Sequence, residues 1–308
     1  MPMLAIAAAA GAASAAFYAT LLSGSFGALI LAYLAQLPLF VAGLWLGFAG
    51  ASVAAVAAIV ALAEAGGAIF ALVYAVANAA PVVVVSYVAQ LNRPTAEGGT
   101  EWYPPGWMIG WLLGIAMSAF LLLNVMLMGE TGGAEGTVRN FVEAALRQLG
   151  LPGRGSPEGT SAMAAVIARF FPGVIADSWM VMVIANAVLA QGLLARFGRN
   201  LRPSPSMAEI ELPSWVTGAT VIAAVGSFLP GAAGFVGGNL VLMAVLAFAL
   251  AGLGVIHALL ARSNNRTVAL VATYAFLFVF GWPLVIVALL GAAEPWLNLR
   301  RRFGGSGT

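Results

Sequence analysis

The stretch MLAIAAAAGAASAAFYATLL, residues 3–22, decides the fold of this chain together with FGALILAYLAQLPLFVAGLWLGF, residues 26–48. Neither stretch contains a charged residue. A helix of about 20 apolar residues covers the roughly 30 Å hydrocarbon core of a bilayer. The 308-residue chain continues this composition, with 62% hydrophobic residues, 8% charged residues and a mean hydropathy of +1.00, whereas soluble domains have about 25% charged residues. The sequence therefore predicts an all-α, polytopic bundle of transmembrane helices.

Glycine and proline breaks divide the chain into about eight predicted spans. Helical hairpins are expected, because backbone groups in lipid must be satisfied within each helix. The predicted spans are residues 3–22, 26–48, 51–65, 67–91, 107–129, 173–197, 214–230 and 234–261. Tight turns are predicted at Gly24, Gly50, Gly66-Gly67 and Pro230-Gly231.

The arginines predict the orientation of the bundle. They follow the fourth, sixth and eighth spans and recur in the tail, at Arg93, Arg196, Arg199, Arg202, Arg262, Arg266, Arg300, Arg301 and Arg302. Because basic residues gather in the cytoplasmic loops of membrane proteins, we expect both termini in the cytoplasm and the protein in a bacterial inner membrane. The tail reaches that side if residues 267–293 form a short hairpin or re-entrant pair at Gly281-Trp282-Pro283. One tilted span is the alternative.

The first apolar run is interpreted as a retained span. It lacks a positively charged start, and it is longer than the roughly 7–15 apolar residues of a signal peptide. Cleavage after one of its alanines is the alternative. The whole chain, residues 1–308, is predicted to be a single integral-membrane domain, with an N-terminal four-helix part (1–92), an extracytoplasmic segment (130–172) and C-terminal helices (173–302).

The extracytoplasmic segment contains a predicted amphipathic helix over residues 136–149. Its apolar face is formed by Val138, Phe141, Val142, Ala145, Leu146 and Leu149. Glu143 and Arg147 stand four apart on the polar side, and Thr137 is the expected N-cap. Such a helix is expected to lie in the periplasmic membrane interface. A second short helix, residues 161–171, is expected to lead through Pro172 into the sixth span.

Several kinds of chemistry are excluded by composition. All 13 basic residues are arginine and cysteine is absent, so the lysine of a phosphate-binding loop, Schiff-base chemistry, thiol nucleophiles and cysteine metal sites are excluded. The single histidine, His257, cannot form a multi-histidine metal site. No Ser-His-Asp set or HExxH motif is present. The sequence predicts no enzyme, no cofactor and no metal, and the net charge of +2 does not indicate nucleic acid; membrane lipids are the expected surroundings.

Polar residues inside the spans are the best candidates for a ligand site, because each costs a few kcal/mol at mid-bilayer. Asp177, Trp179 and Asn186 form the richest polar and aromatic group, with a dipole-favoured carboxylate and an interfacial tryptophan as the structural alternative. Tyr74 and Asn78 share a helix face with Pro81, whose missing N–H frees a carbonyl that a polar side chain often satisfies. Glu64 is either an interfacial carboxylate or a ligand group facing the outer side.

The remaining polar residues of the spans are interpreted as structural. Asn124, Gln191 and Asn239 are expected to form interhelical hydrogen bonds, and His257 is expected to be a hydrogen-bonded packing residue. Small residues predict close helix packing, within the bundle or against a partner subunit, at Ala5, Ala9 and Ala13, at Ala8, Ala12 and Ala16, and at the GxxxG pair Gly43 and Gly47.

The stretch LAQLPLFVAGLWLGFAG, residues 34–50, resembles bacterial YybS-like integral membrane proteins, the family catalogued as domain of unknown function 2232. The match extends to Asp177-Ser178-Trp179, to Leu212-Pro213-Ser214-Trp215 and to GLGVIHALL, residues 252–260. The tail AEPWLNLRRR, residues 293–302, is similar to the terminal pattern of the family, with Glu294 where an aspartate is usual.

The first half is also distantly similar to the substrate-binding membrane subunits of energy-coupling-factor transporters. In those subunits an alanine ridge on the first helix docks a transmembrane coupling subunit, and Ala5, Ala9 and Ala13 match that ridge in spacing. The resemblance implies partners of two kinds, a coupling subunit and ATPase subunits.

Three functions follow from the sequence. The leading hypothesis is a transport-related protein that binds a small solute for uptake and depends on a separate ATPase module. The alternative is a non-catalytic scaffold in cell-envelope assembly or division. An enzyme acting on lipid comes third, because no catalytic set of residues is present.

Overall fold

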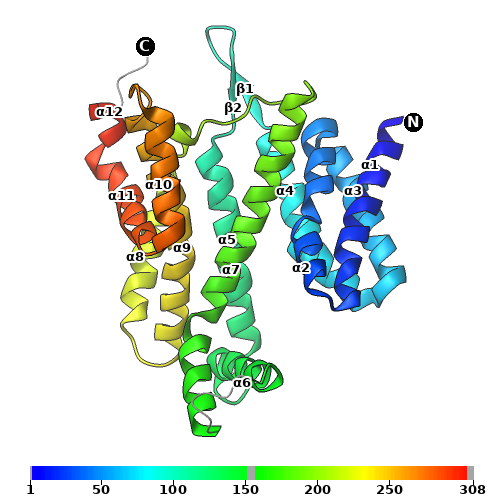
Figure 1. The fold of residues 1–308 in the computed structure, drawn as a ribbon, viewed down its shortest axis with the longest axis vertical. Coiled ribbons are helices and arrows are strands. Elements are labelled where there is room, and N and C mark those ends of the chain that lie inside the picture. Colours follow the sequence, from blue (N-terminus) through cyan, green and yellow to red (C-terminus); the bar gives the residue numbers. More distant parts are fainter. Residues whose placement is uncertain (1, 151–156, 304–308) are drawn as a thin grey trace. The chain divides into compact units, whose positions relative to one another are not determined.

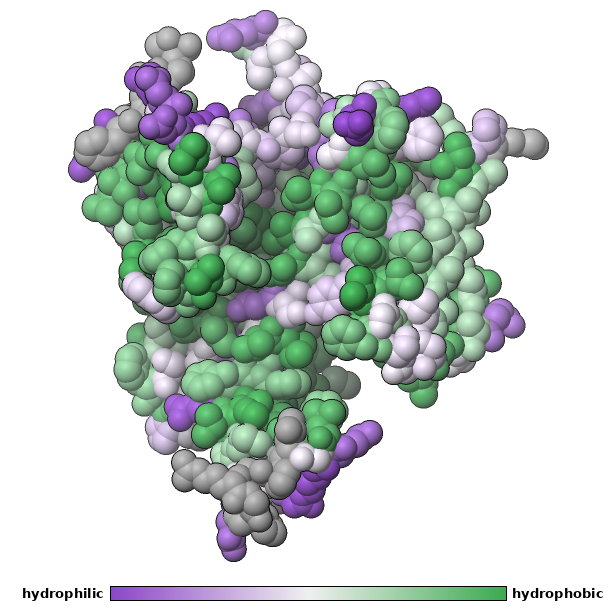
Figure 2. Space-filling view, viewed as in Figure 1, coloured by the Kyte–Doolittle hydropathy of each residue, from purple (hydrophilic) through white to green (hydrophobic). Residues whose placement is uncertain are grey.

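The computed structural model describes residues 2–150 and 157–303, and the described chain is almost entirely helical (Figure 1). Five helical segments in this part are long and apolar enough to cross a membrane, and three shorter apolar helices accompany them. Apolar side chains cover most of the visible surface (Figure 2). Phe26, Phe228 and Phe278 are each more than four-fifths exposed. A surface of this kind faces lipid. The predicted all-α membrane bundle is confirmed.

The chain forms two compact units. The first unit comprises Met1–Met108 and Trp179–Pro205, and the second comprises Ile109–Ser178 and Ser206–Thr308. The prediction of a single integral-membrane domain stays a prediction.

The first unit contains the N-terminal helices and a small β-ribbon. In chain order they are α1 (Pro2–Ala19), the 3-10 turn η1 (Thr20–Ser23), α2 (Phe26–Tyr33), α3 (Gln36–Tyr74), the π-helical turn η2 (Ala75–Ala79), α4 (Ala80–Ala89), β1 (Asn92–Pro94) and β2 (Thr100–Trp102). The two strands pair antiparallel with Arg93 opposite Glu101, and these side chains form an exposed salt bridge of 2.7 Å. The last part of α7 (Pro157–Arg196) completes the unit.

Two glycines with positive φ divide the long helix α3. Gly47 and Gly67 both have φ of 85°, a conformation that glycine adopts without steric cost. The predicted turn at Gly66-Gly67 is confirmed, whereas the turn expected at Gly50 lies at Gly47. The run contains glycines at 43, 47 and 50, and only packing decides which of them turns the chain.

The first helix packs on α3 through Ala7, Gly11 and Ala15, which are all buried. A Cβ atom at Gly11 would lie 2.3 Å from the carbonyl oxygen of Ala54, so only glycine permits this approach. Of the predicted ridges, Ala5 and Ala9 are exposed and Ala13 is half-buried, while Ala8, Ala12 and Ala16 are exposed. Partner packing by these alanines therefore stays a prediction.

The predicted GxxxG pair has two separate roles within the chain. Gly43 packs against α4, where an added Cβ atom would lie 2.3 Å from the hydroxyl oxygen of Ser86. Gly47 forms the turn in α3. Gly43 and Gly47 therefore do not form one GxxxG helix-packing surface.

The second unit is organised around one long helix, α9. In chain order its elements are α5 (Pro105–Met126), α6 (Gly133–Gln148), the first part of α7, the 3-10 turn η4 (Met207–Glu209), α8 (Ser214–Ser227), α9 (Ala232–Leu259), α10 (Arg266–Phe280), α11 (Pro283–Leu297) and α12 (Leu299–Phe303). Helices α8, α11 and α12 and the turn η4 all pack on α9. The turn predicted at Pro230-Gly231 joins α8 to α9 and is confirmed.

The C-terminal apolar stretch folds as two helices and not as one tilted span. Helix α10 ends at Phe280 and α11 begins at Pro283, with Gly281 between them at φ of 67°. The two helices run side by side in Figure 1. The predicted hairpin at Gly281-Trp282-Pro283 is confirmed.

Helix α7 is 40 residues long in total and passes through Pro172 without ending. The predicted separation into a helix over 161–171 and a span beginning at residue 173 is therefore wrong. Asn239 of α9 explains the continuity. Its amide nitrogen donates to the carbonyl oxygen of Arg169 at 3.0 Å, and its amide oxygen accepts from the backbone N–H of Gly173 at 2.8 Å. One buried side chain thus satisfies both backbone groups that the proline separates.

The predicted amphipathic helix is present as α6. Val142 and Leu146 are buried against Ala164 and Ala168 of α7, and Glu143 pairs with Arg147 as expected. The apolar face is otherwise narrower than predicted, since Phe141 is 62% and Leu149 is 70% exposed.

The expected N-cap at Thr137 is wrong. The helix begins earlier, after Gly132 at φ of 79°, and the Thr137 hydroxyl donates within the helix to the carbonyl oxygen of Gly133 at 2.9 Å. A glycine that adopts positive φ starts the helix without a side-chain cap.

The tail is held by Arg300 and Glu294. The Arg300 guanidinium donates to the carbonyl oxygens of Ala208 (2.8 Å), Ile210 (2.7 Å) and Ala251 (3.0 Å). The Glu294 carboxylate accepts the backbone N–H groups of Leu299 (3.0 Å) and Arg300 (3.1 Å), and so caps α12. The glutamate that replaces the usual aspartate thus has a structural role here.

Replacing Arg300 by methionine is expected to lower the free energy of unfolding by about 2 kcal/mol, because three carbonyl oxygens lose a charged donor. Thermal unfolding in detergent measures the change. Arg302→Met is the matched control, since Arg302 is exposed on the same helix. Equal melting temperatures for the two variants would show that the tail contacts contribute nothing.

Candidate functional site

A proline in α4 leaves one carbonyl of the first unit without a helical partner. Pro81 has no N–H, so the carbonyl oxygen of Ala77, four residues earlier, cannot form its usual bond. The helix widens here into the π-turn η2, Ala75–Ala79. Turns of this type occur frequently at functional sites.

Two side chains from other helices satisfy this carbonyl. The indole N–H of Trp179, on α7, donates to the Ala77 oxygen at 2.7 Å, and the Gln36 amide, on α3, donates to it at 3.3 Å. The Gln36 amide also donates to the side-chain oxygen of Asn78 at 3.3 Å. The free carbonyl is satisfied as expected of a proline break, but the prediction that Tyr74 or Asn78 satisfies it is wrong, because the donors come from Gln36 and Trp179.

A second irregular segment lies where α2 ends and α3 begins. The carbonyl oxygen of Tyr33 accepts from the Asn186 amide of α7 at 2.7 Å. The carbonyl oxygen of Ala35 accepts from the Ser14 hydroxyl of α1, which also shares a hydrogen bond with the Tyr74 hydroxyl. The break between α2 and α3 and the π-turn are therefore linked through Gln36, the first residue of α3.

The polar side chains of this region form what we call the interior cluster: Ser14, Gln36, Tyr74, Asn78, Trp179 and Asn186. Trp179 is half-buried and the other five are buried. The exposed fraction is 0% for Ser14, Gln36 and Tyr74, 3% for Asn78 and 2% for Asn186. The Tyr74 ring continues into an aromatic wall, with the Tyr18 centroid 4.9 Å away and that of Phe70 5.0 Å beyond Tyr18.

Two acceptors of the interior cluster have no hydrogen-bond partner within the described chain. They are the side-chain oxygens of Gln36 and Asn186. The amide orientations are determined by the surrounding carbonyls, because each nitrogen faces a backbone oxygen, that of Ala77 or that of Tyr33. An unpartnered buried acceptor costs about 1–3 kcal/mol. A ligand with N–H or O–H donors would remove this cost.

Two of the predicted site residues, Glu64 and Asp177, take no part in the hydrogen bonds of this cluster that the structure describes. Glu64 is exposed on α3 and precedes the turn at Gly67, whereas Tyr74 follows that turn. Asp177 belongs to the second unit, although it stands two residues before Trp179 on α7. It is half-buried, and one of its carboxylate oxygens has no partner among residues 2–150 and 157–303. Within the first unit the structure brings together Tyr74, Asn78, Trp179 and Asn186.

Sequence reasoning missed Ser14 and Gln36. Each is an isolated polar residue in an apolar run, at position 14 of AASAAF and position 36 of LAQLPL. Polar residues within spans are rare because of their insertion cost, and that signal identifies both.

The residues interpreted as structural differ in their bonds. Asn239 joins α9 to α7, and His257 bonds the Tyr274 hydroxyl at 3.0 Å, as predicted. Gln191 bonds the loop after α7 at the carbonyl oxygen of Arg202 (2.8 Å). Asn124 bonds only the Phe120 carbonyl of its own helix (2.8 Å), so its interhelical role is wrong.

Within the part of the chain that the structure describes, no group of three histidine, aspartate, glutamate or cysteine side chains could hold a metal ion. A family model described as predicted membrane protein (DUF2232) matches residues 11–293. No curated protein and no solved structure matches the chain.

Proposed function

We propose that this chain, which belongs to the DUF2232 family of predicted membrane proteins, binds a small solute in its first unit as part of an uptake system with a separate ATPase module. The supporting observation is the interior cluster, where the break between α2 and α3 and the π-turn η2 lie beside the unpartnered oxygens of Gln36 and Asn186. Transporters build their solute sites near the bilayer centre from such discontinuous helices. The solute carries N–H or O–H donors and a face that packs on aromatic rings.

The remaining parts of the proposal concern location and partners. The arginine-bearing connections and both termini lie in the cytoplasm, with the protein in a bacterial inner membrane, as the arginine distribution favours. The energy comes from other subunits, because a chain without lysine lacks a phosphate-binding loop. The exposed alanines Ala5 and Ala9 of α1 are the docking surface for the transmembrane coupling subunit.

A ligand screen by thermal unfolding tests the proposal. A bound solute should raise the melting temperature of purified protein, and saturation at 100 times the dissociation constant stabilises by about 2.7 kcal/mol. In a panel of vitamins and metal ions we expect a shift with at least one vitamin that carries N–H or O–H donors, and we expect Gln36→Leu and Asn186→Leu to abolish it.

Asn124→Leu is the matched control, since it removes a span asparagine whose amide bonds only its own helix. The readout is the shift caused by the ligand, so lower basal stability in a variant does not obscure it. Absence of any shift, together with absence of a co-purified small molecule, would sink the proposal. Recovery of envelope-synthesis proteins instead of ATPase subunits after cross-linking would favour the scaffold.

A further inference from the structure

An arginine of the second unit stands in an apolar part of helix α7. Arg169 lies in the run AAVIARFFPGVI, three residues before Pro172. No acidic side chain within residues 2–150 and 157–303 forms an ion pair with Arg169. Its guanidinium makes a cation–π contact with the Phe170 ring, whose centroid is 6.0 Å from the guanidinium carbon. The Arg169 side chain is exposed, so its guanidinium is open to a counter-charge from outside the described chain.

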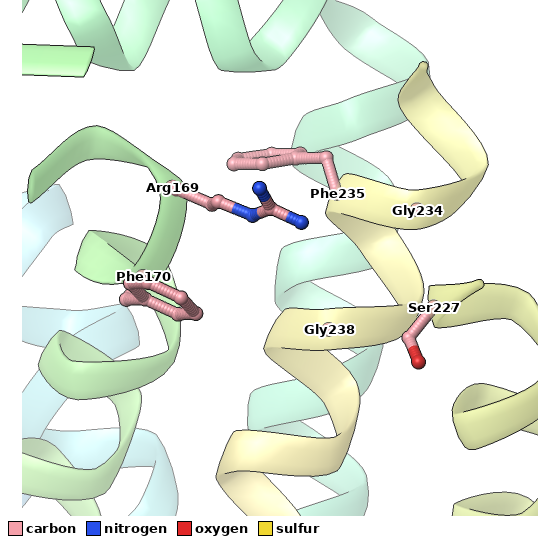
Figure 3. Close-up of a pocket in the computed structure, with 6 residues that line it drawn as sticks. All are labelled: Arg169, Phe170, Ser227, Gly234, Phe235 and Gly238. Carbon is pink, nitrogen blue, oxygen red and sulfur yellow. The ribbon is translucent and has the colours of Figure 1, made fainter. Parts of the chain in front are cut away.

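The side chain extends into a pocket between α7 and α9. Figure 3 shows Arg169 reaching towards α9, below the ring of Phe235 and above that of Phe170. The pocket has a volume of about 210 Å³ and is lined by Arg169, Phe170, Ser227, Gly234, Phe235 and Gly238. Pockets for drug-sized ligands have about 300–1,000 Å³, so this one accepts only a small group.

On the α9 side the pocket is lined in part by two glycines, Gly234 and Gly238, which have no side chain to fill it. At Gly238 an added Cβ atom would have no neighbour within 4 Å, which leaves open space beside the helix. At Gly234 it would lie 2.2 Å from the carbonyl oxygen of Leu229, so the end of α8 approaches the backbone there closely. Both glycines belong to the first two turns of α9, which begins at Ala232, where the helix dipole favours negative charge.

The pocket adjoins the amphipathic helix. Ala168, the residue before Arg169, packs with Val142 and Leu146 of α6. An amphipathic helix with one apolar face lies at the level of the lipid headgroups. Arg169 is therefore placed where phosphate groups are abundant, and its planar guanidinium fork matches a phosphate in two parallel hydrogen bonds.

We propose that this pocket binds one phosphate group, either that of a membrane phospholipid or that of a soluble phosphate ester. Arg169 neutralises the phosphate, and the open backbone at Gly238 admits it. Ser227 also lines the pocket, but its hydroxyl already donates to the Ala224 carbonyl oxygen at 2.7 Å. Ser227 is therefore not the principal ligand of the phosphate. The site lies wholly in the second unit and is independent of the solute site proposed for the interior cluster.

Native mass spectrometry of the full chain released from detergent tests this proposal with three probes: phosphatidylglycerol, uncharged diacylglycerol and inorganic phosphate. We expect retention of phosphatidylglycerol over diacylglycerol. Arg169→Gln should weaken this binding by about tenfold or more, as expected for loss of a charged hydrogen-bond donor. Gly238→Leu should have a similar effect by filling the open space.

One variant serves as the control. Arg139→Gln removes the same charge from the exposed surface of α6 and should bind like the unchanged protein. Displacement of the lipid by inorganic phosphate supports the phosphate as the recognised group, and binding of inorganic phosphate without lipid retention assigns a soluble ester. Equal binding by Arg169→Gln and Arg139→Gln, or no binding of either phosphate probe, overturns the proposal.

Discussion

A single methyl group at Gly252 or Gly291 is expected to prevent α11 from packing on α9. A Cβ atom at Gly252 would lie 1.9 Å from the carbonyl oxygen of Val287, and one at Gly291 would lie 2.0 Å from that of Phe248. The opposing atoms belong to the backbone, so no side chain can rotate away. Overpacking costs about 1–3 kcal/mol and occasionally more, and we expect Gly252→Ala to reach at least the upper end of that range.

The loss should appear as a lower melting temperature in detergent and as protease cleavage near the loosened α11. Gly238→Ala is the matched control, because Gly238 lies on the same helix with no atom opposing its Cβ position. Alanine favours helix over glycine by about 1 kcal/mol, so the control should be at least as stable as the unchanged protein. Equal melting of Gly252→Ala and Gly238→Ala would disprove the close contact.

Replacing Asn239 by alanine is expected to lower the free energy of unfolding by about 3 kcal/mol. The carbonyl oxygen of Arg169 and the N–H of Gly173 would both lose their partner, and each buried unsatisfied group costs about 1–3 kcal/mol. Asn124→Ala is the control, since its side chain bonds only its own helix, and its effect should be much smaller.

A double-mutant cycle with Pro172→Ala identifies the cause. Alanine restores the N–H at position 172 and allows the helix to close the bond between Arg169 and Gly173, so the loss of Asn239 should cost less in that background. We expect a coupling of about 1–2 kcal/mol, within the range for residues in one hydrogen-bond network. Strictly additive effects would show that Asn239 does not act through the proline break.

Both units contain a helix interrupted by proline whose free backbone groups are satisfied by side chains from other helices. Pro81 frees the Ala77 carbonyl, which Trp179 and Gln36 satisfy, and Asn239 serves the break at Pro172. Irregular backbone in membrane helices needs such partners from neighbouring helices. Several polar residues that the sequence offers as site candidates therefore repair irregular helices, whereas the side-chain oxygens of Gln36 and Asn186 have no such partner within the described residues.

Some features of the fold were open to prediction because they depend on local chemistry. The hairpin at Gly281-Trp282-Pro283 follows from a glycine two residues before a proline, and the Glu143–Arg147 pair follows from helical spacing. The turn at Gly47, the break between α2 and α3 and the continuity of α7 through Pro172 were not predicted. The reason is common to all three, because each depends on partners distant in the chain.

The amino-acid sequence by itself determined that this protein is a bundle of apolar helices, because its long uncharged runs are stable only where lipid replaces water. Which polar residues meet was decided by the tertiary structure alone. Trp179 reaches Ala77 across 102 positions of the chain, and Asn186 reaches Tyr33 across 153. Hydrogen bonds are short and directional, so such partners are selected by how the helices pack, and no local pattern encodes them.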